Sequence, residues 1–364
     1  MLAGMKVDCN IGGGPNGTTG GQAAELVSQV ALARRQGFDG VWSTEVNRDP
    51  FLPLAIAATQ STGLQLGTAV AVAFARSPMT TAVAANDLQG LSGGRFILGL
   101  GSQIKPHIER RFSMPWSDPV GRMREYILAL QAIWHSWSTG STLDFRGEHY
   151  RHTLMTPMFT PPPHPYGPPP ILLAAVGPRM TSVAAEYADG LILHSFTSAR
   201  YLREVTLPIV ASGLRISDRS RGRFTVCYPG LVATGSSAQA FERAVAAVRR
   251  QIAFYGATPA YRGVLELHGW ADLHTELHRL SKTGKWDTMT GLIDDQVLDT
   301  LAVVSDPVRA GAELVARFGA LIDRFTLSTP YPLDDAARTG VIEGIRSASQ
   351  ERSAAAFSNR NCPT

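Results

Sequence analysis

Chemically useful residues follow three of the short apolar runs in this 364-residue chain. Glu45 ends the run GVWSTE, His194 ends the run GLILH, and a Gly177-Pro178 pair follows the run ILLAAV. Carboxylates and imidazoles are common proton-transfer groups, and the start of a helix is a common binding site for anions. These three positions are therefore the first candidates for chemistry.

The segment LLAAVGPRMTSVAAEYADGLIL predicts a strand that feeds a helix through Gly177-Pro178. Proline at the first helical position gives up an N–H that has no intrahelical partner, and glycine keeps the turn free of side-chain atoms. The amides near Val176, Gly177, Arg179 and Met180 would then face outward at the positive end of the helix, which suits a phosphate. An ordinary strand-to-helix turn is the alternative.

Two further apolar runs end in small residues. The run LQLGTAVAVAF contains a Gly-Thr-Ala sequence ending at Ala69. Such small residues let a flat ring approach the backbone, although packing inside a buried strand would explain them as well. The run RFILGLG ends in the turn Gly101-Ser102-Gln103. This turn lacks the full dinucleotide-binding fingerprint, but we expect its three residues to contribute to cofactor binding at the strand end.

Glu45 and His194 are the candidates for acid–base chemistry. A carboxylate at the C-terminal end of a barrel strand is placed where active sites form. His194 could hydrogen-bond a ring or act as an acid, and core packing is the alternative. The histidines at 107, 149, 152 and 164 lack the spacing of metal ligands, so we expect no metal site.

Eight short apolar runs alternate with helical patterns along the chain. Continuously apolar runs are typical of parallel strands that helices cover on the outside. Eight such units over this length predict an α/β fold of the (β/α)8 TIM barrel type, with a doubly wound sheet as the alternative. The runs span residues 5–12, 39–45, 64–74, 95–101, 169–176, 189–196, 224–235 and 323–331.

A single barrel domain over residues 1–347 accounts for this pattern, apart from two insertions. Residues 105–170 include a hairpin-like excursion and the stiff, proline-rich segment TPPPHPYGPPP. Residues 256–300 carry leucines at helical spacing, which predicts a helical insertion. Residues 348–364 predict a flexible tail.

Composition narrows the class of protein. The chain is 44% hydrophobic and 18% charged, so it can bury a full core. It contains no run of about 18 apolar residues and no visible secretory signal, which argues against a membrane span and against export. The three cysteines lack metal spacing and fit a reduced cytoplasm. The net charge of +4 is scattered, so nucleic acid is not an expected partner.

Four motifs resemble the luciferase-like superfamily of flavin and deazaflavin oxidoreductases. Within it, the chain is most similar to the branch that uses coenzyme F420, which includes methylenetetrahydromethanopterin reductases. The resemblance covers about residues 5–330, nearly the whole chain. The motifs are ARRQGFDGVW, DPFLPLAIAA, LGTAVAVAFARSPMTTAVAANDLQGLSGGRFILGLGSQ and LLAAVGPRMTSVAAEYADGLIL.

This resemblance implies a cofactor at the C-terminal mouth of the barrel. It implies a non-proline cis peptide bond after the third strand, at Ala69-Val70, that forms a bulge behind the cofactor ring. It also implies that backbone amides after the fifth strand, at Ala175, Val176 and Gly177, hold the cofactor phosphate. The Gly-Pro turn is then a phosphate site.

The chain also departs from two relatives in this superfamily. Sugar-phosphate dehydrogenases and bacterial luciferase carry a histidine after the second strand, where this chain has Glu45. The dehydrogenases carry a glutamate after the fourth strand, where Gln103 or its neighbour stands. We therefore expect neither glucose 6-phosphate as the substrate nor light emission.

The resulting hypothesis is an F420-dependent oxidoreductase that exchanges a hydride with a small organic substrate. Glu45, and next His194, would exchange the proton, and the insertion near Tyr261, His268 and Trp270 would shape the substrate pocket. A reduced-FMN monooxygenase and a non-catalytic flavin-binding protein are the alternatives. The expected assembly is a homodimer. Cations available for the anionic tail of the deazaflavin are Arg76, Lys105, Arg110 and Arg179.

Overall fold

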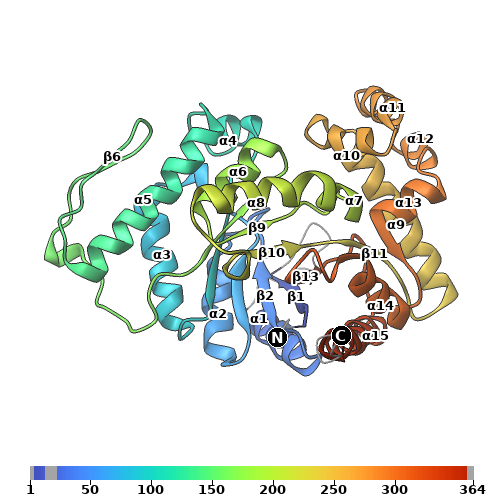
Figure 1. Ribbon diagram of the computed structural model, residues 1–364, viewed down its shortest axis with the longest axis horizontal. Coiled ribbons are helices and arrows are strands. Elements are labelled where there is room, and N and C mark those ends of the chain that lie inside the picture. Colours follow the sequence, from blue (N-terminus) through green and yellow to red (C-terminus); the bar gives the residue numbers. More distant parts are fainter. Residues whose placement is uncertain (1–3, 13–22, 359–364) are drawn as a thin grey trace, which may run out of the picture.

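Eight parallel strands close into a barrel in the computed structural model, which describes residues 4–12 and 23–358 (Figure 1). Each strand pairs with the next one along the chain, and the last pairs with the first. The predicted (β/α)8 barrel is therefore confirmed. The strands are β1 (Lys6–Ile11), β2 (Gly40–Ser43), β3 (Gln65–Thr68), β5 (Phe96–Gly101), β8 (Ile171–Ala174), β9 (Gly190–Ile192), β10 (Thr225–Tyr228) and β13 (Arg324–Leu327).

Helices cover the outside of the barrel (Figure 1). Proline lies in the first turn of six of them, α2, α3, α5, α6, α8 and α14, where its missing N–H has no intrahelical partner to lose. The helices of this layer are α1 (Ala23–Arg35), α2 (Leu52–Gln60), α3 (Pro78–Leu91), α5 (Pro119–Thr139), α6 (Pro178–Tyr187), α8 (Leu207–Ile216), α9 (Ala238–Gly256), α14 (Pro307–Phe318) and α15 (Asp335–Ser358).

Two additions extend from opposite sides of the barrel (Figure 1). The first is α4 (Lys105–Arg110) and the hairpin β6 (Phe145–Arg146) and β7 (Arg151–His152). The second comprises α10 (Arg262–Leu267), α11 (Ala271–Ser281), α12 (Trp286–Gly291) and α13 (Asp295–Leu301), beside the paired strands β11 (Leu231–Ala233) and β12 (Ala302–Val304). The second addition packs around its own apolar cluster, which includes Leu277 and Leu298.

Among the described residues, no helix is long and apolar enough to cross a membrane. Several shorter elements complete the described chain. They are β4 (Ala71–Val72), η1 (Ala73–Ala75), η2 (Pro157–Phe159), α7 (Ala199–Tyr201), η3 (Leu202–Thr206), η4 (Arg221–Arg223) and η5 (Pro259–Tyr261).

The segment predicted to be a tail from residue 348 is helical as far as Ser358, because α15 packs tightly along α14. A Cβ atom on Gly311 of α14 would lie 2.2 Å from the Val341 carbonyl oxygen, and one on Gly344 of α15 would lie 2.1 Å from that of Val308. The two helix backbones therefore approach each other through a pair of glycines. Residues 359–364 lie outside the described residues.

A buried ion pair joins the first strand of the barrel to the last. Arg324 of β13 donates from Nε and Nη2 to the two carboxylate oxygens of Asp8 in β1, and these side chains are 3% and 0% exposed. Arg324 also donates to Gln65 of β3. Burial opposes the charged form of Arg324, but the attraction of Asp8 outweighs it, and the pKa of the guanidinium is raised. The guanidinium carbon lies 5.7 Å from the centre of the Trp42 ring.

Replacing Arg324 by methionine should destabilise the barrel strongly, because it leaves the Asp8 carboxylate buried without its partner. We expect the free energy of unfolding, measured by denaturant titration, to fall by about 3–5 kcal/mol. Arg146→Met is the control, since it breaks a pair with Asp144 whose side chains are both 56% exposed, and it should cost no more than about 1 kcal/mol. Similar losses in both variants would contradict a special role for the buried pair.

Candidate active site

A cavity of about 240 Å³ lies at the C-terminal ends of the barrel strands. This is the end of a (β/α)8 barrel at which active sites form. The predicted residues Ala69, Val70 and His194 are part of its wall. The rest of the wall consists of Asn10, Trp42, Ala174, Ile192, Leu193, Ser195, Cys227, Pro229 and Thr326.

One side of the cavity is formed by a backbone bulge after β3. The Ala69-Val70 peptide bond is cis, as the family resemblance implies. The Ala69 amide donates to the Ser43 carbonyl over 2.8 Å, and the Glu45 amide donates to the Val70 carbonyl over 3.3 Å. Gly101 leaves room for Val70, because a Cβ atom there would lie 2.6 Å from a Val70 methyl group.

Glu45 supports this bulge from behind. Its Oε2 accepts hydrogen bonds from the Val72 amide at 2.7 Å and from Arg76 Nη1 at 2.5 Å, and its side chain is 6% exposed. Arg76 also pairs with Asp49 over 3.0 Å. Burial opposes the charge of Arg76, but its bonds to the two carboxylates raise the pKa of the guanidinium. Among the described residues, Glu45 is outside the cavity wall and serves as an anchor of the bulge.

His194 borders the cavity and is held in a defined orientation. Its Nδ1 accepts a hydrogen bond from the Phe196 amide over 3.1 Å, so the proton of the neutral ring sits on Nε2. Nε2 lies 3.0 Å from the Tyr261 hydroxyl, and the two rings stack 4.2 Å apart. Burial lowers the pKa of His194 to about 4. The imidazole is therefore a neutral N–H donor at physiological pH.

The aromatic residues around His194 come from the end of α9 and from η5, just before the helical insertion. The Tyr255 ring at the end of α9 meets the imidazole edge to face at 4.6 Å. Further out, His268 lies 2.8 Å from the Ser198 hydroxyl and stacks on Trp270. The structure thus brings His194 and Tyr261 together, and it places His268 and Trp270 around Ser198, outside the cavity wall formed by the described residues.

The N-terminus of α6 is open. No side chain caps it, and no atom lies within 4 Å of a Cβ atom placed on Gly177. Among the described residues, no hydrogen bond is formed by the amides of Val176, Gly177, Arg179 and Met180. The Ala175 amide differs, since it donates to the Ile192 carbonyl over 3.2 Å. The available donors therefore begin one residue later than the family resemblance implies.

The turn after β5 does not reach the cavity. Ser102 donates to the Gln103 carbonyl over 3.1 Å, and the Gln103 side chain accepts from the Ile104 amide over 3.0 Å. Gln103 has a positive φ of 60°, which fits this tight turn. Within the part of the chain that the structure describes, Gly101, Ser102 and Gln103 stabilise the loop and do not line the cavity.

The four predicted tail-binding cations are not equally available. Arg76 is occupied by Glu45 and Asp49. Lys105 lies 3.8 Å from Glu109, and its side chain is 61% exposed. Arg110 and Arg179 are exposed, and neither has an ion pair among the described residues. Arg179 adjoins the open end of α6, so it is the best placed of the four.

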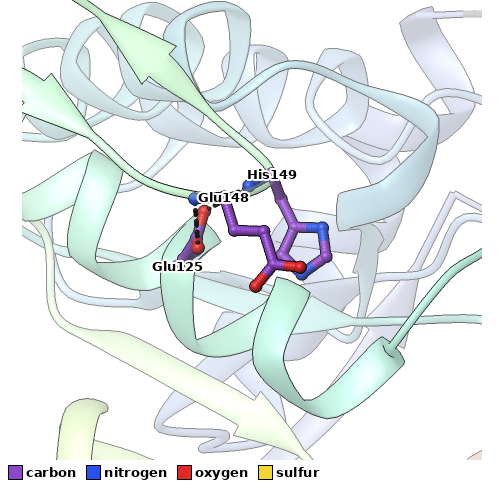
Figure 2. Close-up of side chains that lie close together, drawn as sticks. All are labelled: Glu125, Glu148 and His149. Atoms are coloured by element: carbon purple, nitrogen blue, oxygen red, sulfur yellow. Dashed lines mark hydrogen bonds between the residues drawn. The ribbon is translucent and has the colours of Figure 1, made fainter.

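A group of two carboxylates and a histidine outside the cavity is structural. Glu125, Glu148 and His149 bring potential ligand atoms within 4.8 Å of one another. However, the buried Glu125 carboxylate accepts hydrogen bonds from the amides of Glu148 and His149 (Figure 2) and also from the amide of Tyr150. Burial opposes its charge, but these three bonds lower its pKa. Glu125 thus ties the β6–β7 hairpin to α5.

Sequence reasoning missed several wall residues, most clearly Asn10 and Trp42. Both lie in barrel strands that the sequence predicts, but nothing in their types marks them as functional. Asn10 Oδ1 and Trp42 Nε1 are buried without a hydrogen-bond partner among the described residues. Trp42 fits only because position 67 is glycine, where a Cβ atom would lie 2.2 Å from the indole. The position of Asn10 near the end of β1 is the feature of the sequence that could have identified it as a cavity residue.

Residues 5–324 match the luciferase-like monooxygenase family. This match spans most of the chain and agrees with the barrel, the bulge and the cavity at its mouth. The chain belongs to the luciferase-like monooxygenase family. The resemblance found in the sequence is confirmed.

Relatives within the luciferase-like family include both unassigned and named proteins. The uncharacterized protein Rv1360 of Mycobacterium tuberculosis is 51% identical over 320 residues, or 88% of this chain and 92% of that protein. A second M. tuberculosis protein, named "Putative coenzyme F420-dependent oxidoreductase Rv3520c", is 32% identical over 84% of this chain and 90% of its own length.

A solved structure shares the fold. The coenzyme F420-dependent tetrahydromethanopterin reductase of Methanopyrus kandleri superposes with a TM-score of 0.74, covering 94% of this chain and 98% of that one. At 18% identity, this likeness shows a common luciferase-like barrel and does not extend to the substrate.

The lowered pKa of His194 predicts a pH dependence of stability. The ordinary pKa is 6.5 and the folded value is about 4, so protons bind the unfolded chain more tightly. The contribution of His194 to the free energy of unfolding is therefore constant above about pH 6.5. It falls as the pH drops toward 4, by at most roughly 1.4 kcal/mol per pH unit.

Removing the imidazole should flatten this slope. In His194→Gln, the melting temperature should change less between about pH 6.5 and 4.5 than in the unsubstituted protein, as measured by calorimetry. His135 is exposed on α5, and His135→Gln should leave the slope unchanged. An identical slope in all three proteins would show that His194 is not the group that titrates.

Proposed function

We propose that this chain is an oxidoreductase that uses the deazaflavin coenzyme F420 to exchange a hydride with a small organic substrate. The observation that carries the proposal is the adjacency of the strand-end cavity and the open N-terminus of α6. Ala174 lines the cavity, and Gly177, three residues later, is the N-cap residue of α6. At about 3.3 Å per extended residue, the two sites lie within roughly 10 Å along the chain. A cofactor whose ring carries a short side chain ending in a phosphate would place its ring in the cavity and its phosphate at the N-terminus of α6.

The residues present fit such a group. Ala69 and Ala174 are small, Val70 and Ile192 are apolar, and Trp42 supplies an aromatic wall. The amides of Gly177, Arg179 and Met180 meet no protein acceptor among the described residues and would hold a phosphate. When bound, a deazaflavin supplies a carbon that accepts or donates a hydride.

The name of the 32% identical relative and the cations near α6 favour the deazaflavin over FMN. Coenzyme F420 carries a longer anionic tail than FMN does. Arg179, Arg110 and Lys105 are exposed and could bind that tail. A reduced-FMN monooxygenase is the second candidate, since the family itself is named for monooxygenases.

The protein's own groups have separate roles in this proposal. His194 is neutral, so it does not act as a cationic acid, and its single N–H, on Nε2, holds the Tyr261 hydroxyl in place. The Tyr261 hydroxyl oxygen accepts the hydrogen bond from Nε2–H, so its own proton is available for donation to another acceptor. Glu45 fixes the bulge at Val70 and Val72 through its bonds to the Val72 amide and Arg76. The apolar wall excludes water from the reacting atoms.

Titration of the purified protein with oxidised F420 and with FMN, followed by fluorescence, tests the choice of cofactor. We expect F420 to bind at least about tenfold more tightly, which corresponds to about 1.4 kcal/mol. Tighter binding of FMN would favour the monooxygenase. Tight binding of either cofactor without turnover on any substrate would favour a non-catalytic binding protein.

Gly177→Val tests the phosphate site. Valine adds a branched side chain to the space above the α6 amides, and its backbone conformation there is unstrained, with φ −90°. We expect F420 affinity to fall by about tenfold or more, with an unchanged melting temperature. The control is Gly222→Val, where a Cβ atom also meets nothing within 4 Å. Equal affinity in the two variants would place the phosphate elsewhere.

Glu45→Gln and Arg76→Met separate an anchoring role from proton transfer. If Glu45 anchors the bulge, breaking the pair from either side should weaken F420 binding by a similar factor, because both changes loosen Val72. If Glu45 transfers a proton, Glu45→Gln should reduce kcat by about 10²–10⁴-fold while Arg76→Met retains turnover. Binding titrations and steady-state rates on both variants distinguish these outcomes.

A further inference from the structure

A second and larger cavity, of about 470 Å³, adjoins the first. The two share Asn10, Ser195 and Pro229 as wall residues, so these residues form the boundary between them. The second cavity extends from this boundary along α1, α9 and the loop after β13. Its volume is that of a pocket for a drug-sized molecule.

The wall of the second cavity is polar but carries almost no free charge. Its amide side chains include Gln29, Gln36 and Gln251. Arg338 is the charged residue among the described wall residues, and it donates to Asp335 over 2.9 Å and to the Leu333 carbonyl over 3.0 Å. Its charge is therefore already balanced by a neighbouring carboxylate.

The other ionisable wall groups are neutral at physiological pH. Burial raises the pKa of Cys9 and of Tyr331 to about 12, and it raises the pKa of Tyr255. The Tyr331 hydroxyl donates to the Val232 carbonyl and accepts from the Thr234 amide. In the sequence, residues 13–22, which connect β1 to α1, read GGPNGTTGGQ and contain no ionisable side chain.

Polar groups that could hold a substrate oxygen gather at the boundary of the two cavities. Asn10 donates from Nδ2 to the Ser328 hydroxyl over 3.0 Å, while its Oδ1 is buried without a partner in the described part of the chain. Ser195 hydrogen-bonds with Tyr255 and adjoins His194 in the chain. A molecule in the second cavity reaches the first one past these residues.

We propose that the second cavity binds the substrate, and that this substrate is an uncharged molecule that presents a hydroxyl group to Asn10 Oδ1 and Ser195. The assignment rests on the proposed function, because it takes the first cavity as the place of the cofactor ring. A buried charge without a partner is costly, so a wall without free charge selects against carboxylates and ammonium groups.

Calorimetric titration of the full chain with a matched pair of probes tests this selection. The probes are 4-phenylcyclohexanol and 4-phenylcyclohexanecarboxylate, which differ mainly in charge. We expect the alcohol to bind at least about tenfold more tightly. Equal affinity, tighter binding of the carboxylate, or no binding of either probe would overturn the proposal.

Substitutions in α9 locate the binding site. Gln251 lines the second cavity and not the first, among the residues that the structure describes. Gln251→Arg places a cation in the second cavity, so the protein should then bind the carboxylate more tightly than the alcohol. Gln239→Arg is the matched control on an exposed part of the same helix, and it should leave the preference unchanged. The same result in both variants would show that the probes bind elsewhere.

Ser195→Ala tests the boundary, and cofactor titration separates the two proposals. Loss of the hydroxyl should lower the affinity for the alcohol by about three- to tenfold, as expected for one neutral hydrogen bond, and should not change that for the carboxylate. An unchanged alcohol affinity would remove Ser195 from the site. Because Gln251 does not line the first cavity among the described residues, Gln251→Arg should bind F420 normally. Failure of the unsubstituted protein to bind F420 would overturn the proposed function alone.

Discussion

The Asp8–Arg324 ion pair is the constraint on which the mouth of the barrel depends. It joins the first and last strands and reaches Gln65 on a third, so one guanidinium fixes the register of three strands inside the barrel. Two buried charges are tolerated only because their hydrogen bonds to each other are well formed. Trp42 lies above the guanidinium and forms part of the cavity wall. The ion pair therefore packs against a side chain of the cavity wall without lining the cavity itself, among the described residues.

The walls of the cavity and its outer cover have different origins. Barrel strands and the bulge at Val70 form the walls, and the Glu45–Arg76 pair holds that bulge by its backbone. The outer cover is formed by Tyr255 at the end of α9 and Tyr261 at the end of η5, which meet His194 where the chain enters the insertion. A rigid barrel can thus keep one cofactor geometry while insertions vary the substrate, as is usual for this fold.

The sequence predicted the barrel well because its signal is local: each strand is a short apolar run, and most of the helices around the barrel begin with proline or a capping residue. It also predicted the open helix at Gly177, since a Gly-Pro turn has few structural solutions. It could not predict that Glu45 would meet Arg76, because their pairing depends on the path of the bulge between them. Nor could it show Asn10 and Ser195 at a common boundary, since these residues are brought together only by closure of the barrel. The helical end of the chain was missed because its partner glycines, Gly311 and Gly344, lie on two separate helices.

Gly67 and Trp42 are complementary in size, because the Trp42 indole fills the space that a side chain at position 67 would occupy. Position 67 cannot gain a side chain unless position 42 becomes smaller, so the two should be varied together in any redesign. A smaller aromatic or aliphatic residue at position 42 combined with alanine at 67 would reshape the cavity from its floor. The open amides at the N-terminus of α6 and the residues near His194 would stay in place. The size of the binding site can in this way be adjusted at two neighbouring strands, independently of the loops that recognise ligands.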